Sequence, residues 1–303
     1  MAFYPSYTNL SEADWQCRLE MLREIFSPCM LCPRTCGARR EEDEAGECKS
    51  ARLAKVGSYN LHFGEEPPIS GYAGSGTVFF SGCNLRCLFC QNYPISQMAH
   101  GNFAAAEEIA GYYLELQERG AHNINLVTPS HVNLQWFEAL YIAAKRGLRL
   151  PIVYNCGGYD RVEVLKVFEG VIDIYMPDAK YRDRALAEKL SEAKDYPEVN
   201  AAALREMYRQ VGPLETDDIG VGVRGMLVRH LMIPGQLDNT IACLEDIAAI
   251  SPEIPVSLMT QYFPAYKAQA TPGMDARVTK EEYRAAEAAC RRMGLVNGYF
   301  QRL

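Results

Sequence analysis

Short apolar runs alternate with stretches of helical spacing along most of the chain, from Thr77 onward. Between the runs, apolar side chains recur at helical spacing, most clearly over residues 136–144, 241–248 and 283–293. Strand-helix alternation predicts right-handed crossovers and a parallel sheet. With six such units we expect an α/β fold, namely a partial, open (βα)6 barrel that binds ligands at the carboxyl ends of its strands. The six predicted strands are residues 77–81, 124–128, 151–155, 171–175, 226–233 and 255–259.

The first quarter of the chain has a different character. Residues 11–26 have the pattern of a short helix, and the segment that follows, PCMLCPRTCGARREEDEAGEC, is rich in Cys, Pro, Gly and charge. Such a composition suits a loop wrapped around a metal better than a packed element. We therefore predict two parts: residues 1–75 as a helix with a small metal-binding module, and residues 76–303 as the barrel.

Charge and hydrophobicity exclude several classes of partner. The formal net charge is -7, so no chain-wide basic field attracts nucleic acid or an anionic membrane surface. The first residues lack the basic and apolar regions of a signal peptide, and no uninterrupted apolar stretch approaches the length of a membrane span. We predict a cytoplasmic protein that binds neither nucleic acid nor membrane.

Eleven cysteines in a chain of this kind are unusual. A reducing cytosol keeps thiols free, so clustered cysteines are more often metal ligands than disulfide partners. Seven of the eleven fall in two groups between Cys29 and Cys90. The remaining four are interpreted as ordinary thiols: Cys17, Cys156, Cys243 and Cys290.

The second group, Cys83, Cys87 and Cys90, has the spacing C-x3-C-x2-C and follows the first predicted strand directly. A [4Fe-4S] cluster takes four thiolates, so three thiolates leave one iron open to another ligand. A zinc knuckle or incidental thiols are the alternatives, and the position after Gly82 at a strand end favours the cluster. This motif resembles that of the radical S-adenosylmethionine (SAM) superfamily. The resemblance implies that the backbone at Phe89, an aromatic residue just before the last cysteine, lies near the SAM adenine.

A closer resemblance, over about residues 76–265, is to the pyruvate formate-lyase activating enzyme group. It is carried by the strings YMPDAKY, MLVRHLMIPG and YNCGGY, and it implies that Asp178, Lys180, Arg229 and Asn155 contact SAM. A cation can pair with the SAM carboxylate, and an aspartate can accept from ribose hydroxyls. The alternative to a SAM contact, for each of these residues, is a structural role in an ion pair or a helix cap. The neighbouring His230 is interpreted as a satisfied core histidine.

One segment departs from that group. Where the activating enzymes have a Gly-Gly-Glu segment after the second strand, this chain has VTPSHVN. We expect Thr128 and Ser130, with backbone carbonyls, to accept from the SAM amino group instead. The departure indicates a divergent branch of the group.

The first group of cysteines is Cys29, Cys32, Cys36 and Cys48. Four thiolates close a tetrahedral site and leave no open position. Zinc, an auxiliary [4Fe-4S] cluster and a rubredoxin-like iron all suit four thiolates, and we favour zinc slightly. Free thiols are the alternative. Pro and Gly residues stand where a metal-wrapped loop would bend.

Together these observations predict a radical SAM enzyme that reductively cleaves SAM and abstracts hydrogen from a substrate. The resemblance implies a flavodoxin- or ferredoxin-type reductant, and a glycyl-radical enzyme or other protein as substrate. The alternatives are radical modification of a peptide or small molecule, and a non-catalytic iron-sulfur electron carrier. The predicted barrel argues against the electron carrier, because an electron carrier needs no barrel that lines a pocket. Gln261 and Tyr262, after the sixth strand, are candidate substrate contacts, with simple packing as the alternative for Tyr262.

Overall fold

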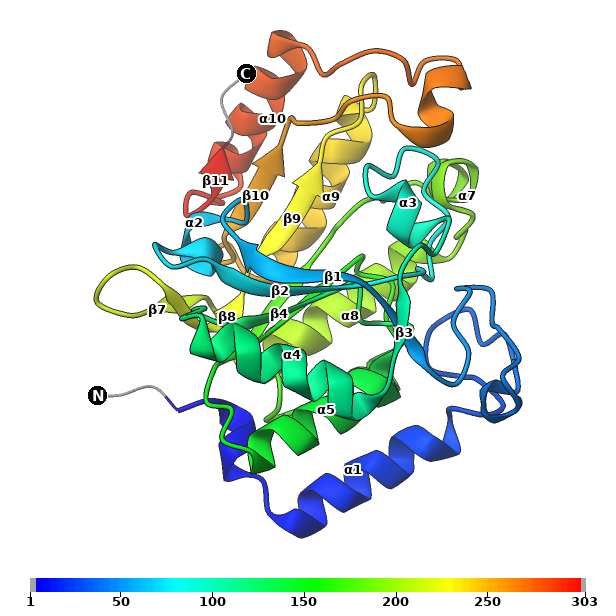
Figure 1. Cartoon of the computed structure of the whole chain (residues 1–303). Helices are drawn as coiled ribbons and strands as arrows, with labels where there is room; N and C mark the ends of the chain where they lie inside the picture. The colour runs from blue at the N-terminus through cyan, green and yellow to red at the C-terminus, as the bar shows by residue number, and fades with distance from the viewer. Residues whose placement is uncertain (1–3, 301–303) are drawn as a thin grey trace.

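The computed structural model describes residues 4–300, and within them the chain forms an α/β fold with a mostly parallel central sheet (Figure 1). The larger sheet has the strand order β3-β1-β2-β4-β5-β6-β8-β7, and a smaller sheet has the order β11-β10-β9. The strands are β1 (Ala54–His62), β2 (Ser75–Phe80), β3 (Asn102–Ala104), β4 (Ile124–Val127), β5 (Ile152–Cys156), β6 (Ile174–Pro177), β7 (Glu215–Thr216), β8 (Gly222–Met226), β9 (Val228–Leu231), β10 (Val256–Met259) and β11 (Tyr299–Phe300).

The parallel strands run continuously from one sheet to the other. The pairs β2/β4, β4/β5, β5/β6 and β6/β8 are parallel, as are β9/β10 and β10/β11. Only Leu227 separates β8 from β9, and a parallel bridge between Asp178 and Arg229 joins the end of β6 to β9. The carboxyl ends of strands from both sheets therefore face a common region.

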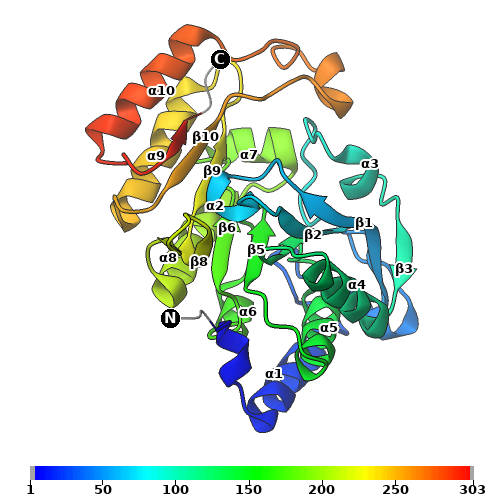
Figure 2. The same cartoon turned by 60° about the vertical axis from the view of Figure 1, so that its left-hand side comes forward.

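Helices pack on the outer surfaces of the sheets, because each has one apolar face (Figures 1 and 2). The helices α9 and α10 lie beside the smaller sheet, whereas α4 and α5 lie side by side against the larger one. The α-helices are α1 (Glu12–Glu24), α2 (Pro67–Ser70), α3 (Tyr93–Ser96), α4 (Ala106–Glu118), α5 (Asn133–Lys145), α6 (Val162–Val167), α7 (Arg184–Ser191), α8 (Tyr196–Val211), α9 (Leu237–Ile250) and α10 (Lys280–Arg292), and the 3-10 helices are η1 (Ser6–Asn9), η2 (Arg40–Glu42) and η3 (Tyr266–Ala270).

The N-terminal helix is fixed at its start and along one face. Ser11 and Asp14 form a reciprocal capping box that begins α1. Trp15 packs on Phe137 and Tyr141 of α5, with ring centroids 5.0 Å and 5.5 Å apart. Burial of a large aromatic side chain contributes about 2 kcal/mol or more. The predicted helix over residues 11–26 is therefore confirmed, and it is docked on the main domain.

The predicted α/β class, with parallel pairing, is also confirmed. Each of the six predicted apolar runs overlaps a strand, although the run 171–175 starts three residues before β6, which begins at Ile174. The run 226–233 corresponds to the end of β8 and all of β9. The structure adds β1, which belongs to the predicted N-terminal part yet pairs with β2 in the main sheet.

No helix among residues 4–300 has both the length and the apolar character that crossing a membrane requires.

Candidate functional site

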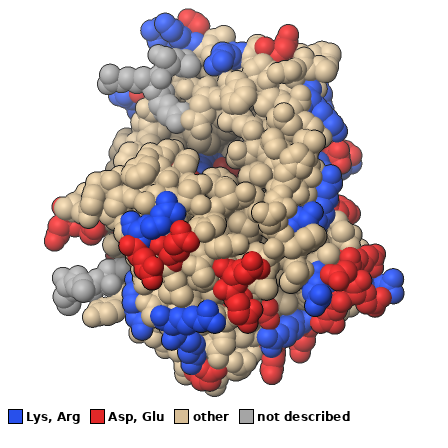
Figure 3. Space-filling model, viewed as in Figure 1, with Lys and Arg blue, Asp and Glu red and all other residues tan. Residues whose placement is uncertain are grey.

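A cavity of about 770 Å³ opens at the carboxyl ends of the parallel strands. Its lining includes residues at or just after the ends of β2, β4, β5, β6, β9, β10 and β11. This is the edge at which parallel α/β folds bind their ligands. Figure 3 shows one face of the molecule hollowed, with acidic and basic atoms visible inside.

The three-cysteine loop forms one wall of the cavity, and all three of its thiols line it. Each sulfur has a polar partner. The Leu85 N–H donates to Cys83 Sγ (3.4 Å), the Ser191 hydroxyl donates to Cys87 Sγ (3.0 Å), and Cys90 Sγ lies 3.0 Å from Ser96 Oγ. Burial, reinforced by the neighbouring Cys87, raises the pKa of Cys83 to about 12. Burial also raises the pKa of Cys87.

Lys180 and Asp178 follow β6 and lie within the cavity wall next to that loop. Their side chains form an ion pair. Burial works against the charge of Lys180, but the Asp178 carboxylate and the sulfur of Cys87 raise its pKa above the ordinary value. The loop between β5 and α6 supports this pair. Gly158 has φ +70°, and a Cβ there would lie 2.1 Å from the Asp178 carbonyl oxygen, so only glycine fits.

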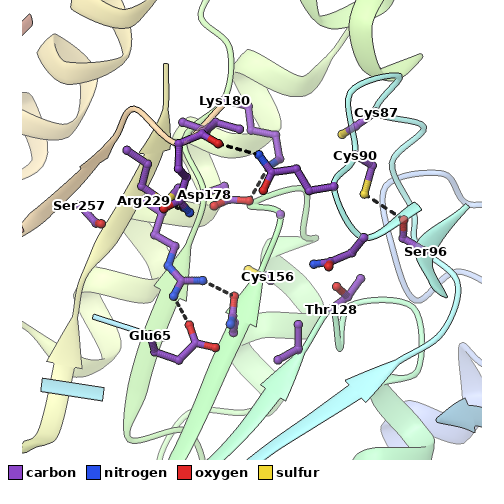
Figure 4. A pocket seen from close by; sticks show the side chains of 18 of the residues that line it. Glu65, Cys87, Cys90, Ser96, Thr128, Cys156, Asp178, Lys180, Arg229 and Ser257 are labelled. Carbon is purple, nitrogen blue, oxygen red and sulfur yellow. Dashed lines mark hydrogen bonds and ion pairs between the residues drawn. The ribbon is translucent and has the colours of Figure 1, made fainter. Parts of the chain in front are cut away.

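Arg229 lies across the cavity from the cysteines (Figure 4). Its guanidinium donates to both oxygens of Glu66 (2.9 and 3.0 Å), to Glu65, and to Asn155 Oδ1 (3.3 Å). Burial opposes the charge of Arg229, yet Glu66 and Glu65 hold its pKa above the usual range. Likewise, burial opposes ionisation of Glu66, but Arg229 keeps the pKa of that carboxyl below its usual value.

The segment VTPSHVN places one of its two predicted residues in the cavity. Thr128 lines the cavity and has a φ of 60°. This backbone conformation is strained for a β-branched residue. Strained residues of this kind cluster at functional sites. Its N–H donates to the Asn155 carbonyl oxygen (2.8 Å). Ser130 is buried and does not line the cavity; its hydroxyl instead lies in a network with Asp160 and Tyr154.

Of the other predicted residues, some line the cavity and others are buried behind it. Phe89 and Gln261 line the cavity. Tyr262 is fully buried behind it, and its hydroxyl donates to the Met274 carbonyl oxygen (2.6 Å). His230 is buried between the Ala179 carbonyl oxygen (2.6 Å) and the Thr240 hydroxyl (3.0 Å). It is therefore the satisfied core histidine that we predicted, and burial lowers its pKa to about 4.

Sequence reasoning missed the acidic side of the cavity. Glu65 and Glu66 lie between β1 and α2, and only 6% and 7% of their side chains are exposed. His62 Nδ1 is 3.2 Å from Glu65 Oε1, and the Ser257 hydroxyl donates to Glu66. The adjacent pair of glutamates before two prolines was visible in the sequence, but nothing local connects it to Arg229.

The four cysteines of the N-terminal module lie together behind the three-cysteine loop, outside the cavity lining. Cys29, Cys32 and Cys48 are buried, and Cys36 is half-buried. Burial raises the pKa of Cys29, and burial with the nearby Cys48 raises that of Cys32 to about 12. Among residues 4–300, no three His, Cys, Asp or Glu side chains are arranged to hold a metal ion as they stand.

The chain has a relative among known proteins. The chain is 30% identical over 281 residues to the uncharacterized protein MJ0674 of the archaeon Methanocaldococcus jannaschii, a match that covers 89% of this chain and 76% of that protein. The chain belongs to the family of MJ0674. No family model matches the sequence. The name of this relative states no activity.

Proposed function

We propose that this member of the MJ0674 family is a radical SAM enzyme that abstracts hydrogen from its substrate. The observation that carries the proposal is the coincidence of three cysteines, spaced C-x3-C-x2-C, with a large cavity at the carboxyl ends of parallel strands. A [4Fe-4S] cluster held by these thiolates would supply an open iron for SAM and the electron that cleaves it to a 5'-deoxyadenosyl radical.

The thiols suit an iron-sulfur cluster in number and surroundings. Three side chains face one cavity, and each sulfur has an N–H or O–H partner. Such donors stabilise thiolate sulfur and tune a cluster that it holds. Binding a cluster requires the thiols to turn toward a common centre, and the loop lies at the edge of an open cavity that leaves room for this.

The polar residues of the cavity suit the rest of SAM. Lys180 lies next to the cysteines and keeps its positive charge. Its ion pair with Asp178 leaves further ammonium hydrogens that can bind a carboxylate. Asp178 offers an acceptor for ribose hydroxyls, and Phe89 an apolar surface next to the cysteines. Arg229 is already bound by two glutamates, so we assign it to shaping the cavity floor together with Asn155.

We also propose the finer description of the fold. The six parallel strands β2, β4, β5, β6, β8–β9 and β10 would form a partial (βα)6 barrel, with Ile69 of α2 packed against Val153, Ile174, Met176 and Leu227 inside it. A barrel that is open on one side admits a substrate next to SAM. The glutamates that precede α2 would then stand at the cavity floor.

The test is formation of 5'-deoxyadenosine. The protein is reconstituted without oxygen using iron and sulfide, then given dithionite and SAM. We expect 5'-deoxyadenosine from the wild type and none above background from the variant Cys83→Ala/Cys87→Ala/Cys90→Ala. The matched control is Cys17→Ala, an exposed cysteine outside both groups, which should behave as the wild type.

Thermal unfolding of the triple variant shows whether it still folds. Absence of 5'-deoxyadenosine from a wild-type protein that contains about four irons per chain would contradict the proposal. A reducible cluster that does not cleave SAM would favour the electron carrier instead.

A further inference from the structure

Arg40 is a buried charge without a carboxylate partner. It lies in η2 of the N-terminal module and is fully buried. Its guanidinium donates to the His131 carbonyl oxygen (2.6 Å) and to Cys48 Sγ (3.0 Å), and its Nε has no hydrogen-bond partner. Among residues 4–300, no ion pair joins Arg40 to an aspartate or glutamate.

A guanidinium keeps its positive charge inside a protein. A buried charge that has no opposite charge nearby costs several kcal/mol. The surroundings of Arg40 must therefore supply an anion, and its sulfur contact shows where. Cys48 is in direct contact, and a Cβ placed on Gly46 would lie 3.6 Å from both Cys48 Sγ and the Arg40 guanidinium, and 3.0 Å from Cys36 Sγ.

The other two cysteines have the local backbone of metal-binding knuckles. The Leu31 N–H donates to the sulfur of Cys29, and the Arg34 N–H donates to the sulfur of Cys32. Each donor lies two residues after its cysteine, so the chain wraps around both sulfurs and directs N–H dipoles at them. These bonds favour sulfur that carries negative charge. Metal coordination is the ordinary way to make four clustered thiols anionic at neutral pH.

We propose that Cys29, Cys32, Cys36 and Cys48 bind one zinc ion in a closed tetrathiolate site, with Arg40 as its buried counter-charge. A divalent ion with four thiolates carries a net charge of about -2, and Arg40 reduces this to about -1. Zinc is assigned rather than a single ferrous ion because such sites bind Zn²⁺ more tightly than Fe²⁺. The four protons of the thiols pass to solvent when the metal binds.

The site would also position the three-cysteine loop. Arg40 holds the His131 carbonyl, and the His131 ring is 2.9 Å from the Ser81 carbonyl oxygen, just before that loop. The Cys48 carbonyl oxygen lies so close to Gly82 that a Cβ there would be 2.3 Å away. Arg34 donates to the Asn84 carbonyl oxygen (2.8 Å). The zinc site therefore backs the loop on the side away from the cavity.

The test measures metal in the full-length variant Cys83→Ala/Cys87→Ala/Cys90→Ala. Because the second cysteine group is absent, the result does not depend on the proposed radical SAM function. We expect about one zinc per chain and almost no iron by elemental analysis after dialysis against a weak chelator. Replacing zinc with Co²⁺ should give the visible absorption bands of a tetrahedral thiolate site.

The role of Arg40 is tested in the same background. Arg40→Met should release zinc to a chromogenic chelator at least about tenfold faster than its parent, because the anionic site loses its counter-charge. The matched control is Arg39→Met, whose side chain is 65% exposed, and it should release zinc at the parent rate. Equal rates for both variants would overturn the role of Arg40. Absence of zinc, or about four irons with sulfide, would overturn the zinc site itself.

Discussion

The two cysteine groups are neighbours in space but face opposite environments. The four cysteines of residues 29–48 are packed behind the loop around a buried arginine, whereas Cys83, Cys87 and Cys90 face a large cavity. Each region contains a buried arginine, but Arg40 is paired with sulfur and Arg229 with two carboxylates. We propose that this difference in thiol number and in access to the cavity separates a closed metal site from a cluster that is open to SAM.

Removal of one cysteine from each group tests whether the two groups differ in function. Cys83→Ala should lower 5'-deoxyadenosine formation by more than about 100-fold, because the proposed cluster loses one of its three protein ligands. Cys36→Ala, from the other group, should reduce zinc content yet retain part of the activity. Iron, zinc and 5'-deoxyadenosine are measured on the same preparations. Equal loss of activity in both variants would show that the groups are not separate in function.

The second prediction concerns the arginine of the cavity. Arg229→Met leaves Glu65 and Glu66 buried side by side without a cation, which should lower the free energy of unfolding by about 4 kcal/mol. Urea unfolding of the metal-free protein measures it. The control is Arg182→Met, which breaks an exposed pair with Asp246 (2.8 Å) and should cost less than about 1 kcal/mol. Similar losses in both variants would mean that the buried pair does not stabilise the cavity floor.

The third prediction concerns the contact between the four-cysteine module and the three-cysteine loop. Arg34 extends from the four-cysteine module to carbonyl oxygens of Asn84, Ser191 and Glu192. Arg34→Ala should cost about 2 kcal/mol of stability and reduce iron incorporation at Cys83, Cys87 and Cys90, while zinc content stays unchanged. Lower iron at unchanged zinc would identify Arg34 as a positioning residue. Unchanged iron would show that the module does not brace the loop.

The smallest predicted effect is the acid response of a buried histidine in the α/β fold, which is separate from the cysteine groups. Burial lowers the pKa of His230 to about 4, so between about pH 6.5 and 4 the unfolded chain takes up a proton that the folded chain excludes. Stability is therefore lost as the pH falls through this window, by about 2 kcal/mol from pH 7 to 5. Urea unfolding of the metal-free protein should show that His230→Gln has less of this loss. An equal pH dependence in both proteins would exclude His230 as its source.

Sequence reasoning found the elements that are buried on both faces. Short, mainly apolar runs such as residues 124–128 and 151–155 favour buried strands, and the structure has β4 and β5 there. It missed β1, because AKVGSYNLH is a half-exposed strand with Lys, Gly, Ser and Asn and no clear alternation. The need for glycine at position 57 of this strand comes from tertiary packing, since a Cβ there would lie 2.8 Å from the Ile95 side chain.

The candidate site was predictable only where spacing along the chain is informative. Two groups of cysteines within short segments, and Asp178 with Lys180 after a strand, are local patterns. The ion pair between Glu66 and Arg229 spans 163 residues, and the pairing of Arg40 with Cys48 depends on how the module folds. Ser130 does not line the cavity, because its hydroxyl is held in a buried hydrogen-bond network with Tyr154 and Asp160.

The most direct test is whether SAM binds the cluster that we propose at the three-cysteine group. The reconstituted protein is reduced without oxygen, and its electron paramagnetic resonance spectrum is recorded with and without SAM. The account predicts that SAM changes the spectrum of the reduced cluster in the wild type and in Cys36→Ala, because one iron at Cys83, Cys87 and Cys90 is open to it. Identical spectra with and without SAM would contradict it.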